Sequence, residues 1–352
     1  MKKVIGIALI CITIASIFTA CSSNEKASKP DDNNNDKNQT NQENNKSENE
    51  NGDTTPTTEP DKTAFPEEHL QKLDEGDTVE ALQTSLNEIG YDIAVNGTYD
   101  ERTTWAITDF QIQNSLHATG IYNKETADTA TQFLADEKQV DAGKGLPFKE
   151  NTEKTESGNP ISNNPYDVLG ITNKHHALPS DFIPDDLVVP NVRFPFTEDL
   201  PKKQLRKVAA DALEELFAAG DEAGMDLFAQ SGFRSYDRQD AIFAANVEKN
   251  GEKAANNYSA RPGESEHQTG LTMDITSPEV GYKLNIEFGD TAEGKWVKEN
   301  ASDYGFIIRY PEDKVDITEY QYEPWHLRYV GKKAAKEITE KGLSFEEYLG
   351  EK

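Results

Sequence analysis

Cysteine is scarce in this chain of 352 residues, and its two copies, Cys11 and Cys21, both lie near the start. The rest of the sequence therefore has no disulfide framework and no thiolate to offer a metal. Any metal bound by the main body of the chain would have to use His and carboxylate side chains instead.

Hydrophobic and basic residues are also few. Only 35% of the chain is hydrophobic, so we expect a good part of it not to pack into a core. Lysine and arginine number 36 against 64 acidic residues, which gives a formal net charge of -28. No nucleic-acid partner is expected, because no basic surface would neutralise phosphates, and anionic membranes are not favoured either.

An apolar run lies at the N-terminus. Two lysines precede apolar residues 4–20, which is typical of a secretory signal, although such a run could also be a short membrane anchor. The run ends in Phe18-Thr19-Ala20-Cys21, which resembles the bacterial lipobox. The resemblance implies that residues 1–20 are a lipoprotein signal peptide and that Cys21 carries lipid. The protein would then be extracytoplasmic, anchored to the cell membrane by lipid and facing the cell wall.

Residues 21–66 consist mostly of Asn, Asp, Glu, Lys, Ser and Thr. Such a segment cannot bury enough surface to offset the entropy lost on ordering. We interpret it as a disordered tether, and we interpret residues 138–165 as a second polar linker.

Between these segments, residues 67–137 predict a small three-helix domain. Apolar residues at helical spacing indicate the helices. They are expected near residues 79–89, 104–113 and 125–134. A Gly-x-Tyr-x-x-x-Thr pattern occurs at residues 97–103 and again at residues 120–126. It predicts two alike turns, each with a threonine capping the helix that follows.

Several motifs in this stretch resemble the peptidoglycan-binding domain found beside many bacterial wall hydrolases. They are Val79-x-x-Leu82-Gln83-x-x-Leu86, Gly90-Tyr91, Asn96-Gly97-x-Tyr99 and Ala106-x-x-x-Phe110-Gln111. The resemblance implies binding to wall glycan. A three-helix spacer without a ligand is the alternative.

Residues 166–352 mix helical and strand patterns. Leu271, Met273 and Ile275 alternate with polar residues, so Asp274 is expected to leave the core face for a cleft. Other strands are expected near residues 226–230, 306–309 and 322–330, and helices near residues 205–217, 241–249, 296–304 and 332–341. Helices grouped against a small, mostly antiparallel sheet predict an α+β fold.

One constellation in this half offers metal ligands. His267, Asp274 and His326 supply two imidazoles and a carboxylate, and three protein ligands leave a fourth zinc position open for water. Glu323 is then a spare acid that can take a proton from that water. Because it lies three residues before His326, a role as a fourth ligand is the alternative.

Two further features of the sequence bear on this site. Arg234 follows a short strand and a glycine, a place from which a side chain points into a cleft, and its guanidinium suits a carboxylate or a developing oxyanion. A structural salt bridge is the alternative. His175 and His176 are poor metal ligands, because adjacent residues of an extended chain rarely face one ion.

Four motifs, in order along the chain, resemble the VanY-type D-alanyl-D-alanine carboxypeptidases and their L,D-carboxypeptidase relatives, zinc peptidases of the bacterial wall. They are Ser231-Gly232-Phe233-Arg234-Ser235 with Gln239, Ala260-Arg261-Pro262-Gly263-x-Ser265-Glu266-His267-x-x-Gly270-x-x-x-Asp274, Tyr304-Gly305-Phe306-Ile307-x-Arg309-Tyr310, and Glu323-Pro324-Trp325-His326-x-Arg328-Tyr329-Val330-Gly331. The resemblance implies a carboxypeptidase that removes C-terminal D-alanine from peptidoglycan stem peptides.

The resemblance also assigns roles to single residues. His267, Asp274 and His326 would bind one zinc ion per chain, and Glu323 would be the catalytic base. Arg234 would polarise the scissile carbonyl. Two more residues, Ser265 and Gln239, match positions that contact substrate.

Two alternatives stay open. An endopeptidase of the wall would share the metal and the base and differ only in the shape of its cleft. A non-catalytic wall-binding lipoprotein would be marked by loss of a site residue, and all of them are present. A serine mechanism is not favoured, because no Gly-x-Ser-x-Gly elbow occurs.

Substrates ending in D-Ala-D-Ala or in a single D-Ala are both compatible with the sequence.

Overall fold

The computed structural model describes residues 64–150, 152–256 and 258–351. Cys21, the predicted signal peptide and nearly all of the predicted tether lie outside the described residues. Within those ranges, no helix combines the length and the apolar character needed to cross a membrane.

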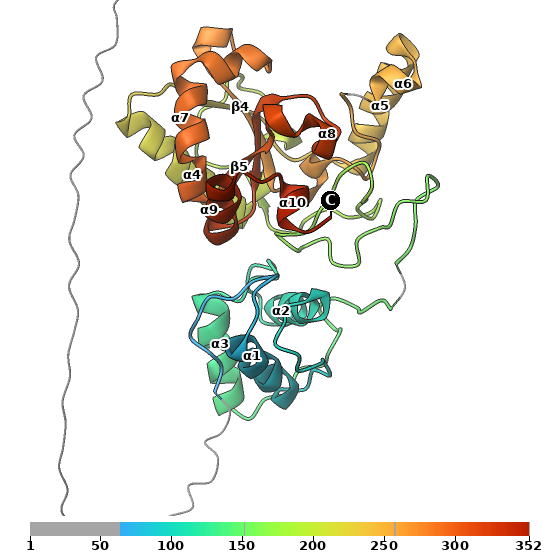
Figure 1. The fold of residues 1–352 in the computed structure, drawn as a ribbon, viewed down its shortest axis with the longest axis vertical. Coiled ribbons are helices and arrows are strands. Elements are labelled where there is room, and N and C mark those ends of the chain that lie inside the picture. Colours follow the sequence, from blue (N-terminus) through green and yellow to red (C-terminus); the bar gives the residue numbers. More distant parts are fainter. Residues whose placement is uncertain (1–63, 151, 257, 352) are drawn as a thin grey trace, which may run out of the picture. The chain divides into compact units, whose positions relative to one another are not determined.

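The three helices predicted in the N-terminal half are present (Figure 1). They are α1 (Asp77–Glu88), α2 (Glu101–Gln113) and α3 (Lys124–Ala135). Their apolar faces meet in one core that includes Leu82, Leu86, Tyr99, Phe110 and Tyr122. Burial of such a stripe stabilises short helices that would be marginal alone.

The helix caps differ from the prediction. The side chain of Asp100 accepts a hydrogen bond from the backbone N–H of Thr103, and Asn123 does the same for Thr126. The caps are therefore the Asp and Asn before each helix, and the predicted threonine caps are wrong. Each threonine lies three residues after its cap and already within the helix, where its N–H needs a partner.

Two buried glutamines explain the repeated turn. Gln83 Oε1 accepts hydrogen bonds from the backbone N–H groups of Asn96 and Gly97, at 2.9 and 3.0 Å. Gln111 Oε1 likewise accepts from the N–H of Gly120 at 3.0 Å. One glutamine from the preceding helix thus satisfies the backbone of each turn, and the sequence repeat is a repeat of this arrangement.

The segment predicted as a linker, residues 138–165, begins with residues that pack on the helices. Buried Asp109 accepts hydrogen bonds from the backbone N–H groups of Gly145 and Leu146, at 2.8 and 2.7 Å. The indole N–H of Trp105 donates to the carbonyl oxygen of Leu146 at 2.8 Å. This part of the segment is therefore tied to α2.

The second half of the chain has the predicted α+β fold. Its helices are α4 (Lys207–Glu222), α5 (Tyr236–Asn250), α6 (Glu252–Ala255), α7 (Ala292–Asn300), α8 (Val315–Thr318), α9 (Lys332–Lys341) and α10 (Phe345–Tyr348). Its strands are β1 (Leu187–Val188), β2 (Leu205–Arg206), β3 (Phe228–Ser231), β4 (Thr272–Thr276), β5 (Phe306–Tyr310) and β6 (Glu323–Tyr329). The main sheet has the order β3-β4-β6-β5, and every neighbouring pair is antiparallel.

The largest of the apolar clusters that include residues of this sheet packs on one of its faces. Leu213 and Phe217 of α4 and Val297 of α7 share a buried cluster with Met273 and Ile275 of β4. Figure 1 shows α4 and α7 on the same side of the strands. The predicted alternation of β4 is confirmed, and the side of β4 that carries Asp274 is left for a site.

The predicted start of the helix at Leu205 is wrong. Leu205 and Arg206 are extended and pair with β1, and α4 begins at Lys207. The N–H of Arg206 donates to the carbonyl oxygen of Gly270 at 2.8 Å, a contact between segments far apart in sequence. Leu205 is fully buried in the observed strand. A helix starting at this residue would also bury it, so the apolar spacing could not distinguish a strand from a helix here.

Candidate metal centre and active site

Strand register brings the first site residues together. Asp274 of β4 lies directly opposite His326 of β6, and Tyr310 of β5 lies opposite Glu323. His267 lies on the short 3-10 helix Glu266–Thr269, just before β4. Gly270 links the two with a positive φ of 68°, and a Cβ there would lie 2.8 Å from Arg206 Cγ. Glycine is therefore required at this turn.

His267, Asp274 and His326 form a buried cluster that can hold a metal ion. One ligand atom from each residue lies within 4.8 Å of the others. His326 Nδ1 is 3.1 Å from Asp274 Oδ1, and His267 Nε2 is 3.5 Å from Asp274 Oδ2. Asp274 Oδ1 is buried and has no hydrogen-bond partner among the described residues. A cation bound at this position would satisfy it, so the donor set fits a metal.

The two imidazoles of the cluster have different environments. Burial lowers the pKa of His267 to about 3, with a further contribution from Arg234, so this ring is neutral at pH 7. Burial also lowers the pKa of His326, but Asp274 and Glu266 outweigh it and raise the pKa to about 9. The carboxylates around His326 thus favour positive charge here, as a metal site requires.

Glu323 lies beside the cluster. Its Oε2 is 3.6 Å from His326 Nδ1. Burial raises the pKa of Glu323 to about 7, while His326 lowers it and Asp274 raises it in smaller measure. A carboxyl group with this pKa can both accept and release a proton near neutral pH.

Arg234 lies where the sequence predicted it, between β3 and α5. Its Nη1 donates to Gln239 Oε1 at 2.8 Å, and Gln239 Nε2 donates to the carbonyl oxygen of Ala260 at 2.6 Å. Since α5 begins at Tyr236, earlier than predicted, Gln239 lies in its first turns and can reach back to the arginine. Burial lowers the pKa of Arg234, Asp274 opposes this, and the group stays cationic.

All seven predicted residues of this half line one cavity of about 230 Å³. They are Arg234, Gln239, Ser265, His267, Asp274, Glu323 and His326. The other histidine pair, which the sequence did not favour as metal ligands, makes different contacts. His175 Nε2 lies 2.9 Å from Glu319 Oε1, and His176 Nδ1 lies 3.2 Å from Asn173 Oδ1.

Several residues around the cavity were not singled out from the sequence. Tyr310 and Tyr320 line it, with their rings stacked at 4.5 Å between centroids. Glu266 is fully buried behind His326, where it pairs with Arg309 and Arg328. The arginines of β5 and β6 were a signal for such a buried acid, because a buried guanidinium needs a carboxylate partner.

The sequence matches two known families. Residues 202–332 match VanY, described as "D-alanyl-D-alanine carboxypeptidase". Residues 75–129 match PG_binding_1, described as "Putative peptidoglycan binding domain".

Individual relatives agree with the VanY match. The chain is 48% identical over 244 residues to "Putative carboxypeptidase YodJ" of Bacillus subtilis (strain 168), covering 65% of this chain and 88% of that protein. It is 37% identical over 146 residues to a D-alanyl-D-alanine carboxypeptidase of Enterococcus faecium, covering 41% of this chain and 44% of that protein. The solved LdcB LD-carboxypeptidase is similar with a TM-score of 0.55 and 54% identity, covering 57% of this chain and 93% of that one.

Proposed function

Because the chain belongs to the VanY family of D-alanyl-D-alanine carboxypeptidases, we propose that it removes the C-terminal D-alanine from peptidoglycan stem peptides. It is a zinc carboxypeptidase. One observation carries the proposal: the metal-binding cluster, the spare acid Glu323 and the cation Arg234 all line the same cavity.

The metal is assigned to zinc from the chemistry of its ligands. Two imidazoles and one carboxylate, with no thiolate, are a common donor set for a catalytic zinc with an open position. His267, Asp274 and His326 would hold the ion. When bound, zinc would lower the pKa of a coordinated water to about 7 and polarise a carbonyl group.

Glu323 supplies the proton transfer. Its carboxylate would accept a proton from the attacking water as the oxygen adds to the scissile carbonyl carbon. It would return that proton to the nitrogen of the departing D-alanine as the carbon–nitrogen bond breaks. The pKa of about 7 suits both transfers, and no residue needs to form a covalent intermediate.

Arg234 supplies charge stabilisation. Its cationic side chain lines the cavity and suits the oxyanion that develops on the carbonyl. Gln239 was predicted to contact substrate, but both ends of its amide are engaged, one with Arg234 and one with Ala260. We therefore assign Gln239 the role of holding the guanidinium and leave the direct contact to Ser265.

Attachment to the wall and the membrane completes the proposal. The match of residues 75–129 to a peptidoglycan-binding family supports wall glycan as a partner of the helical domain. The lipobox-like residues before Cys21 support a lipid anchor and an extracytoplasmic location.

Cys21→Ala tests the anchor: the protein should leave the membrane fraction or accumulate as a precursor. A detergent-extractable, processed variant would contradict it.

Stem-peptide digestion tests the activity. The purified protein, incubated separately with a tetrapeptide stem and a pentapeptide stem, should release free D-alanine from at least one, as seen by mass spectrometry. Chelation of the metal should stop the release, and added zinc should restore it. Cleavage only inside cross-linked stems would support an endopeptidase, and intact peptides in every sample would refute both.

A further inference from the structure

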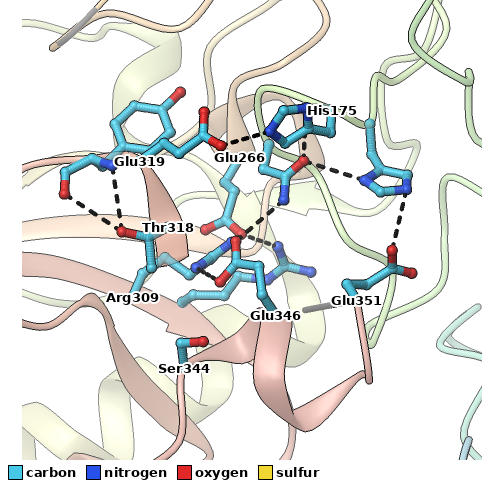
Figure 2. A network of polar contacts seen from close by, with 12 residues as sticks. His175, Glu266, Arg309, Thr318, Glu319, Ser344, Glu346 and Glu351 are labelled. Atoms are coloured by element: carbon cyan, nitrogen blue, oxygen red, sulfur yellow. Dashed lines mark hydrogen bonds and ion pairs between the residues drawn. The ribbon is translucent and has the colours of Figure 1, made fainter. Parts of the chain in front are cut away.

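Glu266 directly precedes the metal-cluster residue His267 and lines the cavity, and its side chain also belongs to a buried charge cluster. Figure 2 shows Glu266, Arg309 and Glu346 within one network of polar contacts. Glu266 Oε1 accepts hydrogen bonds from Arg309 Nε at 2.7 Å and from Arg328 Nη1 at 2.8 Å. All of these side chains are essentially inaccessible to solvent.

The second oxygen of Glu266 faces the metal cluster. Oε2 lies 3.5 Å from His326 Nε2. Neither atom has another hydrogen-bond partner among the described residues, and both are buried. Two buried, unpartnered polar atoms that face each other at this distance are each other's natural partner, since leaving either one alone would cost free energy.

The other nitrogen of His326 faces the metal position. Nδ1 lies 3.1 Å from Asp274 Oδ1 and 3.6 Å from Glu323 Oε2. A neutral imidazole can offer a metal only the nitrogen that does not carry the proton. If the proton is on Nε2 and points at Glu266, Nδ1 is free to bind.

His267 has the same arrangement with its nitrogens exchanged. Its Nδ1 lies 2.8 Å from the carbonyl oxygen of Gly232, which can only accept a hydrogen bond. Its Nε2 is the nitrogen that faces Asp274. Each histidine therefore has a hydrogen-bond acceptor that selects its tautomer. The acceptor is a backbone carbonyl for His267 and a carboxylate for His326.

We propose that Glu266 is a positioning residue for His326: by accepting the Nε2 hydrogen, it fixes the ring and its tautomer so that Nδ1 faces the metal. This inference rests on the zinc assignment in the proposed function. A carboxylate that accepts the second N–H of a metal-bound histidine sets the orientation and raises the basicity of the ligand.

The charged residues around Glu266 keep its carboxylate ionised and fixed in position. Burial alone would raise the pKa of Glu266, but Arg309 and Arg328 hold it well below its usual range. Arg309 is held in turn by Glu346 of α10, at 2.9 and 2.6 Å, and Arg328 Nη2 donates to the carbonyl oxygen of Gly170 at 2.9 Å. Two arginines balance two glutamates, so the group can stay ionised in the interior.

The substitution Glu266→Gln tests whether Glu266 sets the tautomer of His326. Both oxygens of the glutamate accept hydrogen bonds, whereas a glutamine has one oxygen that accepts and one NH₂ group that donates. The two arginines only donate, so they should keep the glutamine oxygen and turn its NH₂ group toward His326. Nε2 would then have to accept, and the proton would move to Nδ1, the nitrogen that faces the metal. Glu346→Gln is the matched control, because it removes charge from the same arginine without contacting His326.

Zinc affinity of the purified full chain, measured by competition with a chromophoric chelator, separates the two variants. We expect Glu266→Gln to bind zinc about 10- to 100-fold more weakly, the usual effect of removing such a partner. Glu346→Gln should lower the melting temperature but bind zinc like the wild type. If zinc affinity is unchanged in Glu266→Gln, or falls equally in both variants, Glu266 is only structural and the inference is wrong.

A measurement on the wild type does not depend on how the variants fold. Long-range ¹H–¹⁵N NMR spectra of the zinc-loaded protein, labelled with ¹⁵N-histidine, should show a proton on Nε2 of His326 and on Nδ1 of His267. A proton on Nδ1 of His326 would overturn the inference. A wild-type chain that binds no zinc would overturn the zinc assignment and this inference with it, whereas zinc binding with the wrong tautomer would overturn the inference alone.

Discussion

Asp274 and His326 lie opposite each other on adjacent antiparallel strands, with Asp274 Oδ1 3.1 Å from His326 Nδ1. The register of β4 against β6 sets this distance. A one-residue slip of either strand would turn that strand's site residue to the apolar face, so the packing of that face also holds the site.

Glu323→Gln should separate the base from the ligands. The variant keeps two imidazoles and Asp274, so we expect about one zinc per chain by metal analysis. Its turnover should fall by roughly 10²- to 10⁴-fold, the range that general-base catalysis supplies. His267→Ala is the comparison, because it should lose zinc affinity and activity together. Zinc loss in Glu323→Gln equal to that in His267→Ala would make Glu323 a ligand.

The rate should fall on the acid side of neutrality. Glu323 acts as a base only when deprotonated, and burial raises its pKa to about 7, so kcat/KM should decline as the pH drops through this region. A bound zinc cation favours the carboxylate, so the midpoint should lie at pH 7 or below. Stem-peptide kinetics between pH 5 and 8 would test this. A flat profile over that range would contradict it.

Gln83→Ala and Gln111→Ala should each destabilise the helical domain. Each glutamine is buried and satisfies two backbone N–H groups of a turn, and the loss of a buried partner costs about 1–3 kcal/mol. Gln132→Ala is the matched control, because Gln132 is exposed and its side chain bonds only Asp136 among the residues that the structure describes. Thermal unfolding followed by circular dichroism would compare the three. Equal melting temperatures would mean that the turns do not depend on the glutamines.

A fragment of residues 64–149 should fold and sediment with purified cell-wall sacculi. A shorter fragment ending at residue 137 should be less stable, because it loses the segment that satisfies Asp109 and covers Trp105. Circular dichroism and a pelleting assay would measure both properties. If the longer fragment stays in the supernatant while the whole protein pellets, the helical domain does not bind the wall.

The sequence by itself predicted what depends on neighbours along the chain. The periodicity of α9 predicted its bounds, Lys332–Lys341, and the alternation around Asp274 predicted which face of β4 it occupies. These patterns are local, because helical and strand periods repeat within a few residues. The residue types of the metal cluster could be recognised for the same reason, since each lies in a short motif.

Only the tertiary structure decided what depends on segments distant in sequence. Leu205 and Arg206 pair with β1 instead of extending α4, and Gln239 is held by Ala260 as well as by Arg234. Glu266 is the clearest case. Nothing beside it in the chain indicates that two arginines hold its carboxylate, because Arg309 and Arg328 reach it only when β5 and β6 pair. Burial removed water as an alternative partner, and the arginines thereby determined where the carboxylate points.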